Sequence, residues 1–200
     1  MKHKFIETIR FANSEAQLID YHQRRIELTQ ETFYGLKNLN LRDILPNVNE
    51  ESDMRCRIVY SDKVEDVEVT KPIEYDIQEL VVVHANGINY DFKSANRRVF
   101  DKLSEGLEPN QSPLVVKDGF ITDTPISNVV IKIGDELITP KAPLLKGVQR
   151  QFLIDNHIIT EAPVPISIME FVDEIMLVNC MMPLEKSIRL PKTAIKNWKV

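Results

Sequence analysis

The chain has 200 residues, of which 43% are hydrophobic and 28% charged, a composition typical of a globular protein with one large domain or two small ones. A formal net charge of -5 argues against nucleic acid or an anionic membrane as the main partner. No apolar run has the length of a membrane-spanning helix or of a signal peptide. Cys56 and Cys180 are far apart and lack metal-ligand spacing, which predicts reduced thiols and a cytoplasmic location.

The first half of the chain predicts a strand, a helix and a small antiparallel sheet. Polar and apolar residues alternate at the start, and a helical spacing follows from Asp20 to Leu36. The sheet is expected to extend from Val59 to Val83, and its last strand is apolar enough to be buried on both faces. Ala85-Asn86-Gly87 interrupts the pattern, so we expect one subdomain over residues 1–86 and a second over 87–200. The predicted strands are 4–11, 54–61, 64–70 and 77–84.

Two pairs of basic residues in this half can each be interpreted in two ways. His22 and Arg25 lie on the same face of the predicted helix. They form either a solvated basic face or a site at which an arginine binds a phosphate with two hydrogen bonds. Arg55 and Arg57 share one face of a predicted strand and are either surface charges or a clamp for a carboxylate.

The second half predicts a helix from Lys93 to Leu103, followed mostly by short strands. Gly134-Asp135 indicates a hairpin turn. A second helix is expected over residues 151–154, after a run that contains Gly147. The predicted strands are 113–116, 120–122, 128–133, 136–139 and 174–178.

Lys93 and Asp123 stand at the ends of predicted elements, as a site for pyridoxal phosphate requires. Such a site needs an amine that forms a Schiff base and a carboxylate that keeps the pyridine nitrogen protonated. Gly147 at a helix entrance would let backbone N–H groups point at a phosphate, although glycine before a helix is also ordinary loop geometry. Cys180 is interpreted as a packed thiol rather than a nucleophile, since no histidine is near it in sequence.

In this order, the segments resemble the class IV aminotransferases, the fold-type IV pyridoxal-phosphate enzymes, across nearly the whole chain. The resemblance implies an α+β fold like that of D-amino-acid aminotransferase, with a small N-terminal α/β subdomain, a larger barrel-like C-terminal one and the site in the cleft between them. The segments that carry it are Phe5-Ile6-Glu7-Thr8-Ile9-Arg10, Tyr21-His22-Gln23-Arg24-Arg25-Ile26, Phe92-Lys93-Ser94-Ala95-Asn96-Arg97, Ile121-Thr122-Asp123-Thr124-Pro125-Ile126-Ser127-Asn128 and Leu145-Lys146-Gly147-Val148-Gln149-Arg150.

The resemblance also implies a role for individual residues. Lys93 would be the catalytic residue that binds the cofactor covalently, and Asp123 would face the pyridine nitrogen. Arg57 loosely matches the strand that presents an arginine to a substrate carboxylate. The other residues that would bind the cofactor, several of them at its phosphate, are Arg25, Asn128, Gly147, Val148, Gln149 and Cys180.

One stretch indicates a branch of the family. Residues 173–183 are similar to the Asp-Glu-…-Asn-Ala-Leu-Met-Pro run of aminodeoxychorismate lyases. The implied reaction converts 4-amino-4-deoxychorismate, a small amino substrate, into 4-aminobenzoate and pyruvate in folate biosynthesis, and the implied assembly is a homodimer. The alternatives are an amino-acid transaminase of class IV and a truncated, inactive homologue that acts as a binding module.

Four features depart from the family pattern. An aspartate, Asp123, replaces the glutamate at the pyridine nitrogen. Gln149 and Cys180 stand where the family has threonines on the phosphate side. The family also has a strand before the segment that begins at Phe5, so we expect the small subdomain to be shortened at its N-terminus.

Overall fold

The computed structural model describes residues 2–199, which contacts divide into two compact units. Unit 1 extends to Glu74 and also includes Phe92–Asn96. Unit 2 consists of Tyr75–Asp91 and the chain from Arg97 onward. The segment that holds Lys93 therefore belongs to unit 1, whereas the sequence analysis assigned it to the second subdomain.

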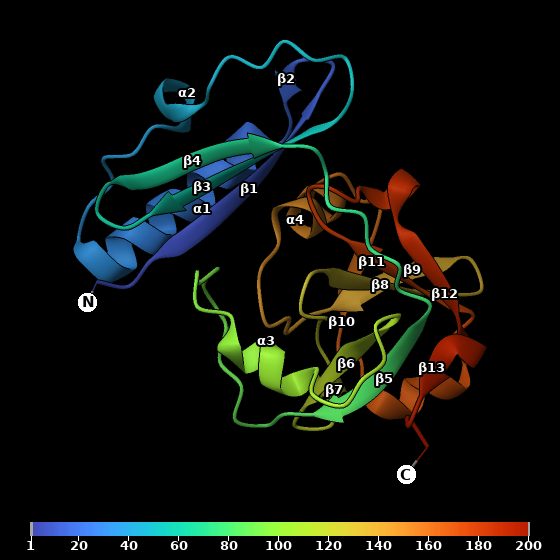
Figure 1. Ribbon diagram of the computed structural model, residues 1–200. Helices are drawn as coiled ribbons and strands as arrows, with labels where there is room; N and C mark the ends of the chain where they lie inside the picture. The colour runs from blue at the N-terminus through green and yellow to red at the C-terminus, as the bar shows by residue number, and fades with distance from the viewer. Residues whose placement is uncertain (1, 200) are drawn as a thin grey trace. The chain divides into compact units, whose positions relative to one another are not determined.

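Unit 1 is an antiparallel sheet in the order β2-β1-β3-β4, with one long helix, α1, against one face (Figure 1). Alternation along β1 and β3 directs one set of side chains into a core that also receives Ile26 of α1. Gly35 ends α1 in the left-handed conformation, which glycine adopts without strain. The bounds are β1 Phe5–Ala12, β2 Glu15–Ala16, α1 Ile19–Tyr34, α2 Leu41–Ile44, β3 Met54–Tyr60 and β4 Val64–Thr70.

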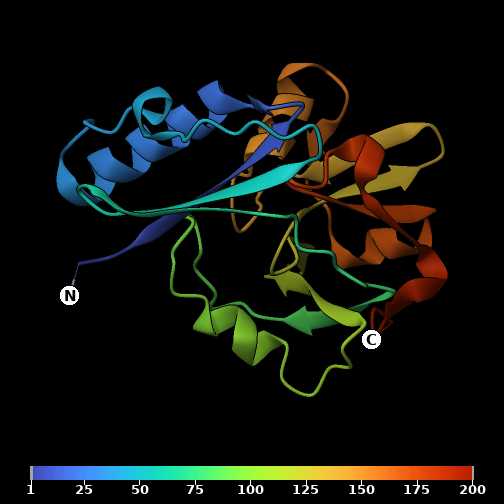
Figure 2. The same cartoon turned by 45° about the horizontal axis from the view of Figure 1, so that its top comes forward.

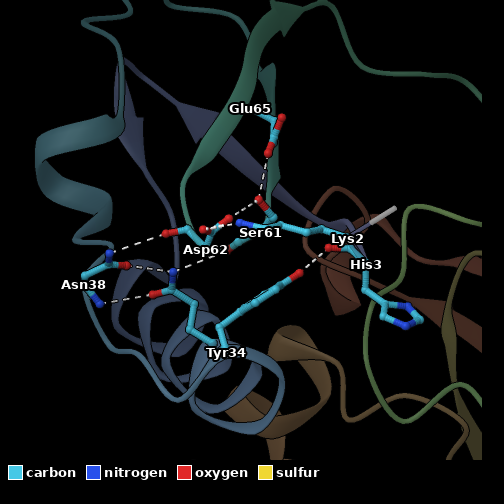
Figure 3. Close-up of polar contacts among 8 residues, drawn as sticks. Lys2, His3, Tyr34, Asn38, Ser61, Asp62 and Glu65 are labelled. Carbon is cyan, nitrogen blue, oxygen red and sulfur yellow. Dashed lines mark hydrogen bonds and ion pairs between the residues drawn. The ribbon is translucent and has the colours of Figure 1, made fainter.

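The N-terminal residues of unit 1 are attached to the end of α1 and to the β3–β4 turn (Figure 3). The Tyr34 hydroxyl donates to the His3 carbonyl, and Lys2 pairs with Asp62 at 2.6 Å. The Ser61 hydroxyl lies within hydrogen-bond distance of two carboxylates, 2.9 Å from Asp62 and 2.7 Å from Glu65. These contacts hold Lys2 and His3, just before β1, against the end of α1 and the β3–β4 turn.

The residues around Lys93 are not helical, and they pair with the start of β1. Ile6 N–H donates to the Lys93 carbonyl at 2.9 Å, and Ala95 N–H donates to the Lys4 carbonyl at 2.8 Å. The predicted helix beginning at Lys93 is therefore wrong, because these backbone groups are hydrogen-bonded to a distant strand. The helix, α3, covers only Arg98–Leu103.

Unit 2 contains two sheets, one in the order β10-β9-β8-β11-β12 and one in the order β13-β5-β6-β7 (Figure 2). Both contribute to one hydrophobic core, with Leu114 and Val116 from one sheet and Val129 and Ile175 from the other. The strands are β5 Glu79–His84, β6 Gln111–Lys117, β7 Phe120–Ile121, β8 Asn128–Ile133, β9 Glu136–Pro140, β10 Thr160–Ala162, β11 Glu174–Val178, β12 Ile188–Pro191 and β13 Ile195–Lys196.

The remaining elements of unit 2 are helical. The longest is α4, and η1 to η3 are single 3₁₀ turns that connect strands. Among the described residues, no helix is long and apolar enough to cross a membrane. The helical bounds are α4 Val148–Asp155, η1 Ile166–Glu170, η2 Leu184–Lys186 and η3 Lys192–Ala194.

The mixed α+β architecture and the barrel-like second half agree with the fold predicted from the sequence. The continuous antiparallel sheet expected between Val59 and Val83 is wrong. β5 instead pairs in parallel with β6 and β13 of unit 2. Its consecutive buried residues Leu80, Val81 and Val82 suit a strand with neighbours on both edges and packed residues on both faces.

Candidate functional site

In unit 1, a buried carboxylate is held by two side chains of α1. Glu7 is fully buried on the α1 face of β1. Its oxygens accept hydrogen bonds from Arg25, with Nε at 2.8 Å and a terminal nitrogen at 2.5 Å, so the contact is bidentate. His22 Nδ1 lies 2.6 Å from the same carboxylate. Three polar side chains thus form one cluster inside the apolar core of unit 1.

The charges of this cluster follow from its geometry. Burial alone would raise the pKa of Glu7, but the Arg25 guanidinium and the His22 contact outweigh it and lower that pKa to about 2. Burial lowers the pKa of His22, although the Glu7 contact acts in the opposite direction. At neutral pH we therefore assign a neutral imidazole beside a carboxylate–guanidinium pair.

The tautomer of His22 is fixed by its neighbour. An ionised carboxylate only accepts hydrogen bonds, so Nδ1 of His22 must carry the proton and Nε2 is left as an acceptor. Nε2 is buried and has no hydrogen-bond partner among residues 2–199. The charge of Lys93 also acts to lower the pKa of His22, and the two predicted cofactor residues Arg25 and Lys93 both belong to unit 1. The alternative of a solvated basic face is wrong, because His22 is fully buried.

Arg57, the predicted substrate residue, lies on the sheet face opposite α1. In the strand register it stands opposite Thr8 of β1 and Glu68 of β4, while Arg55 stands opposite Arg10. The half-buried Arg57 side chain makes no hydrogen bond or ion pair with another described residue, whereas Arg10 pairs with Asp53. The face therefore carries the guanidinium groups of Arg10, Arg55 and Arg57 together with the Glu68 carboxylate, and Arg10 is already paired with Asp53.

In unit 2, the predicted acid is joined to the predicted phosphate-binding turn by direct hydrogen bonds. Asp123 is 3% exposed. Asn128 Nδ2 donates to Asp123 Oδ1 at 2.8 Å and also to the Leu145 carbonyl at 2.8 Å. The Leu145 N–H donates to Asp123 Oδ2 at 2.9 Å. Each oxygen of the buried carboxylate therefore accepts one hydrogen bond from a neutral group.

The pKa of Asp123 is raised toward neutral pH. Burial raises its pKa to about 6, while the Leu145 amide, the Asn128 amide and the charge of Arg150 act to lower it. The acid is therefore ionised in most molecules at pH 7. An ionised, water-excluded carboxylate is the group that holds a proton on a pyridine nitrogen.

At position 147, only glycine leaves room for the Asn128 side chain. Its φ of -70° and ψ of 146° are accessible to any residue, so the need for glycine is not conformational. A Cβ added there would lie 1.9 Å from Asn128 Oδ1. Gly147 also caps α4, where Val148 and Gln149 are buried and occupy the first turn. The N–H groups of that turn have no acceptors within the helix and can bind an anion.

The turn that contains Cys180 lies against the turn that follows Asp123. Asn179 Nδ2 donates to the Ile126 carbonyl at 3.0 Å, and Asn179 Oδ1 accepts the N–H groups of Met181 and Met182. Cys180 is half-buried in this turn. Unit 2 thus assembles six predicted cofactor residues in one region: Asp123, Asn128, Gly147, Val148, Gln149 and Cys180.

Two buried polar residues of these clusters were not singled out from the sequence. Glu7 lies between apolar residues on the inward face of β1, and a carboxylate at an inward position of an alternating strand is the signal that could have identified it. Arg150 is 1% exposed. Its spacing of three from the buried Leu153 places both on the inner side of α4.

Each unit, taken by itself, presents groups that suit part of the cofactor predicted from the sequence. Unit 1 supplies an amine on Lys93 and a guanidinium on Arg25. Unit 2 supplies a buried carboxylate and the amides of a helix N-terminus, beside a glycine whose Cα faces Asn128. Among the described residues, no group of three or more His, Cys, Asp and Glu side chains could hold a metal ion.

Comparison with known proteins gives the family. The family model of amino-transferase class IV matches residues 4–185. An uncharacterized protein of Haemophilus influenzae is 28% identical over 180 residues, which cover 88% of this chain and 96% of the relative.

Two solved structures are similar to this chain over most of its length. A candidate 4-amino-4-deoxychorismate lyase from Haemophilus somnus superposes with a TM-score of 0.85 at 26% identity, covering 92% of this chain and 99% of that one. The PLP-bound form of a hypothetical aminotransferase from Mycobacterium tuberculosis has a TM-score of 0.77 at 17% identity, covering 96% of this chain and 81% of that one. The second likeness concerns the fold alone.

Proposed function

Since the chain belongs to the class IV aminotransferase family, we propose that it is a pyridoxal-phosphate enzyme that converts 4-amino-4-deoxychorismate into 4-aminobenzoate and pyruvate. The observation that carries the cofactor part is the buried Asp123, hydrogen-bonded through Asn128 to the turn that precedes α4. The choice of a lyase is supported by residues 173–183 and by the similarity to the candidate lyase of Haemophilus somnus.

Each predicted residue has a distinct task in this proposal. Lys93 binds the cofactor covalently, and Asp123 keeps the ring nitrogen protonated. Arg25 and the amides of Val148 and Gln149 bind the phosphate, with Arg25 oriented by Glu7. When bound, pyridoxal phosphate supplies an electron-withdrawing ring that stabilises negative charge on the substrate.

In this proposal, Lys93 carries out the proton transfers. Its amine, released from the cofactor when the substrate amino group takes its place, takes the proton from the carbon that carries the substrate amino group. It then returns a proton to the three-carbon group, which leaves as pyruvate when the carbon–oxygen bond to the ring breaks. The remaining ring becomes aromatic, so no oxidant or second substrate is needed. Arg57 binds a substrate carboxylate from the open face of the unit 1 sheet.

The proposal extends to the assembly and the location. We expect a homodimer in the cytoplasm, as the resemblance to the family implies. Light scattering of the purified protein should give twice the mass of the chain, and a monomer at micromolar concentration would contradict this part.

Product analysis tests the reaction. The purified protein, loaded with pyridoxal phosphate, is given 4-amino-4-deoxychorismate and assayed for 4-aminobenzoate and pyruvate in equal amounts. A loaded protein that forms neither product overturns the lyase assignment. If it instead converts an amino acid and a 2-oxo acid, the protein is a transaminase. If it does neither, an inactive homologue that acts as a binding module is favoured.

A further inference from the structure

Arg97 is the residue at which the chain returns to unit 2 after the segment that contains Lys93. Its guanidinium packs on two buried aromatic rings, with Cζ 4.9 Å from the centre of the Phe100 ring and 6.0 Å from that of the Tyr90 ring. The two rings meet edge to face at 4.6 Å. Aromatic faces attract a cation and limit the positions open to a long side chain. The rings therefore direct the half-buried guanidinium of Arg97.

The guanidinium of Arg97 is hydrogen-bonded to the turn that joins Asp123 to Asn128. One terminal nitrogen donates to the Pro125 carbonyl at 2.5 Å, and the other donates to the Tyr90 hydroxyl at 3.4 Å. A hydrogen bond from a cation is stronger than one between neutral groups. The contact with Pro125 thus joins the start of α3 to the turn beside the predicted acid.

The turn at Pro125 is short and closed at its base. The Thr124 N–H donates to the Ser127 carbonyl at 3.0 Å, and the Ser127 N–H donates to the Thr124 hydroxyl at 3.1 Å. Asp123 and Asn128 flank the turn as a bridged pair, and Asn128 Nδ2 donates to Asp123 Oδ1 at 2.8 Å. Movement of the tip of the turn would therefore displace the flanking pair.

A second side chain holds the same turn from another part of unit 2. Asn179 Nδ2 donates to the Ile126 carbonyl at 3.0 Å. The two neighbouring carbonyls at the tip of the turn, those of Pro125 and Ile126, each accept a hydrogen bond from a side chain outside it. Of these two donors, only Arg97 carries a charge, so we expect its removal to have the larger effect.

From these contacts we propose that Arg97 is a positioning residue, whose guanidinium fixes the turn at Pro125 and so keeps Asn128 bonded to Asp123. The inference rests on the proposed function for its purpose, because in that function the Asp123 carboxylate keeps a proton on the cofactor ring. It deepens the function by adding a residue that acts on the acid through the backbone of a turn.

Amide hydrogen exchange tests this role in the full-length protein without added cofactor. The reporters, followed by NMR, are the Thr124 N–H, which is bonded within the turn, and the Leu145 N–H, which is bonded to Asp123. In Arg97→Met both should exchange about tenfold faster, as expected from the loss of one hydrogen bond to a charged group. The amides of β11, a strand paired on both edges, should keep their wild-type rates.

Two further variants separate this contact from general effects of substitution. Arg97→Lys retains a cationic donor and should keep most of the protection. Lys102→Met is the matched control, because Lys102 is an exposed cation of α3, the helix that Arg97 caps, and it should change neither reporter.

Three results would overturn the proposal. Arg97→Met could keep the wild-type rates at both reporters, it could accelerate exchange equally in β11, or Lys102→Met could accelerate the reporters as much. Should Arg97→Met fail to fold, Arg97→Gln, a shorter and neutral substitution that remains polar, is measured in its place and judged in the same way.

The pKa of Asp123 provides a readout that a loss of stability alone would not move. The hydrogen bond from Asn128 acts to lower this pKa, so Arg97→Met should raise it, as followed by ¹³C NMR of the carboxyl carbon against pH. In an Asn128→Ala background the bond is already absent, and Arg97→Met should raise the pKa no further. No rise in the wild-type background, or an equal rise in both backgrounds, overturns the proposal.

These experiments distinguish failure of the inference from failure of the proposed function, because neither measurement uses cofactor or substrate. Failure of pyridoxal phosphate to bind Lys93 would remove the proposed function and leave the effect of Arg97 on the Asp123–Asn128 pair intact. Wild-type exchange rates and an unchanged Asp123 pKa in Arg97→Met would remove the inference and leave the lyase assay to decide the function.

Discussion

Asn128 donates to Asp123 and to the Leu145 carbonyl through the same side-chain nitrogen, both at 2.8 Å. The predicted acid and the start of the predicted phosphate turn are therefore parts of one hydrogen-bonded structure. Displacement of Asn128 is expected to affect both ends of a cofactor at once.

Gly147→Ala should displace Asn128. The added Cβ would lie 1.9 Å from Asn128 Oδ1, and that side chain cannot rotate away without breaking its bonds to Asp123 and Leu145. We expect a loss of about 1–3 kcal/mol in the free energy of unfolding, as for other overpacked sites, and weaker binding of pyridoxal phosphate. Urea unfolding and a cofactor titration measure the two effects.

Gly87→Ala is the matched control for this substitution. Gly87 has nothing within 4 Å of an added Cβ, so both stability and cofactor affinity should stay at the wild-type level. Equal losses in Gly87→Ala and Gly147→Ala would contradict the role of Asn128.

Glu7→Gln should change how stability depends on pH. The pKa of Glu7 in the folded protein is about 2, compared with an ordinary value of 4.5. A lowered pKa means that this carboxylate stabilises the fold fully above pH 4.5, and that its contribution is lost as pH falls toward 2. The contribution is on the order of 3 kcal/mol.

Urea unfolding between pH 7 and pH 3 measures this effect. At pH 7 the Gln variant should be less stable than the wild type, and the difference should shrink as the pH falls below 4.5. Glu136→Gln, at an exposed position of β9, should keep the wild-type profile. A constant difference between Glu7→Gln and the wild type across the whole range would argue against an ionised Glu7.

The sequence predicted more of the local pattern than of the long-range pairing. Alternation identified β1, β3 and β4, and the segment order predicted the fold and brought Asp123, Asn128 and Gly147 into one proposed site. The local sequence pattern wrongly predicted a helix at Lys93. The backbone of this residue instead pairs with the start of β1, which is far from it in sequence. Tertiary contacts of this kind override helix propensity.

The polar clusters were predictable only in part. The spacing of His22 and Arg25 indicated a shared helix face, but the buried Glu7 that orients Arg25 becomes evident only when β1 is packed against α1. Likewise, the contact of Gly147 with Asn128 depends on how a turn and a strand end meet. Neither residue type nor spacing determines which acceptor a buried arginine finds.

Arg25→Met should weaken the binding of pyridoxal phosphate. A methionine removes the guanidinium and leaves Glu7 buried without its bidentate partner. Hydrogen bonds to charged groups contribute about 1.5–3 kcal/mol, so the Kd should rise about 10- to 100-fold. Equilibrium dialysis measures the Kd.

Arg24→Met is the control for Arg25→Met. Arg24 is the preceding residue of α1, is exposed, and lies over the Tyr21 ring at 4.3 Å. The Kd in this variant should match that of the wild type. A Kd in Arg25→Met that is unchanged, or that rises no more than in Arg24→Met, would remove Arg25 from the phosphate site.

The covalent role of Lys93 is the central claim, and borohydride trapping tests it most directly. The protein is incubated with pyridoxal phosphate, reduced with borohydride and digested, and the modified peptide is identified by mass spectrometry. Lys146→Ala, at an exposed lysine beside Gly147, serves as the control. We predict one modified residue, Lys93, in the wild type and in Lys146→Ala, and no stoichiometric adduct in Lys93→Ala. The same adduct in Lys93→Ala as in the wild type would contradict the account.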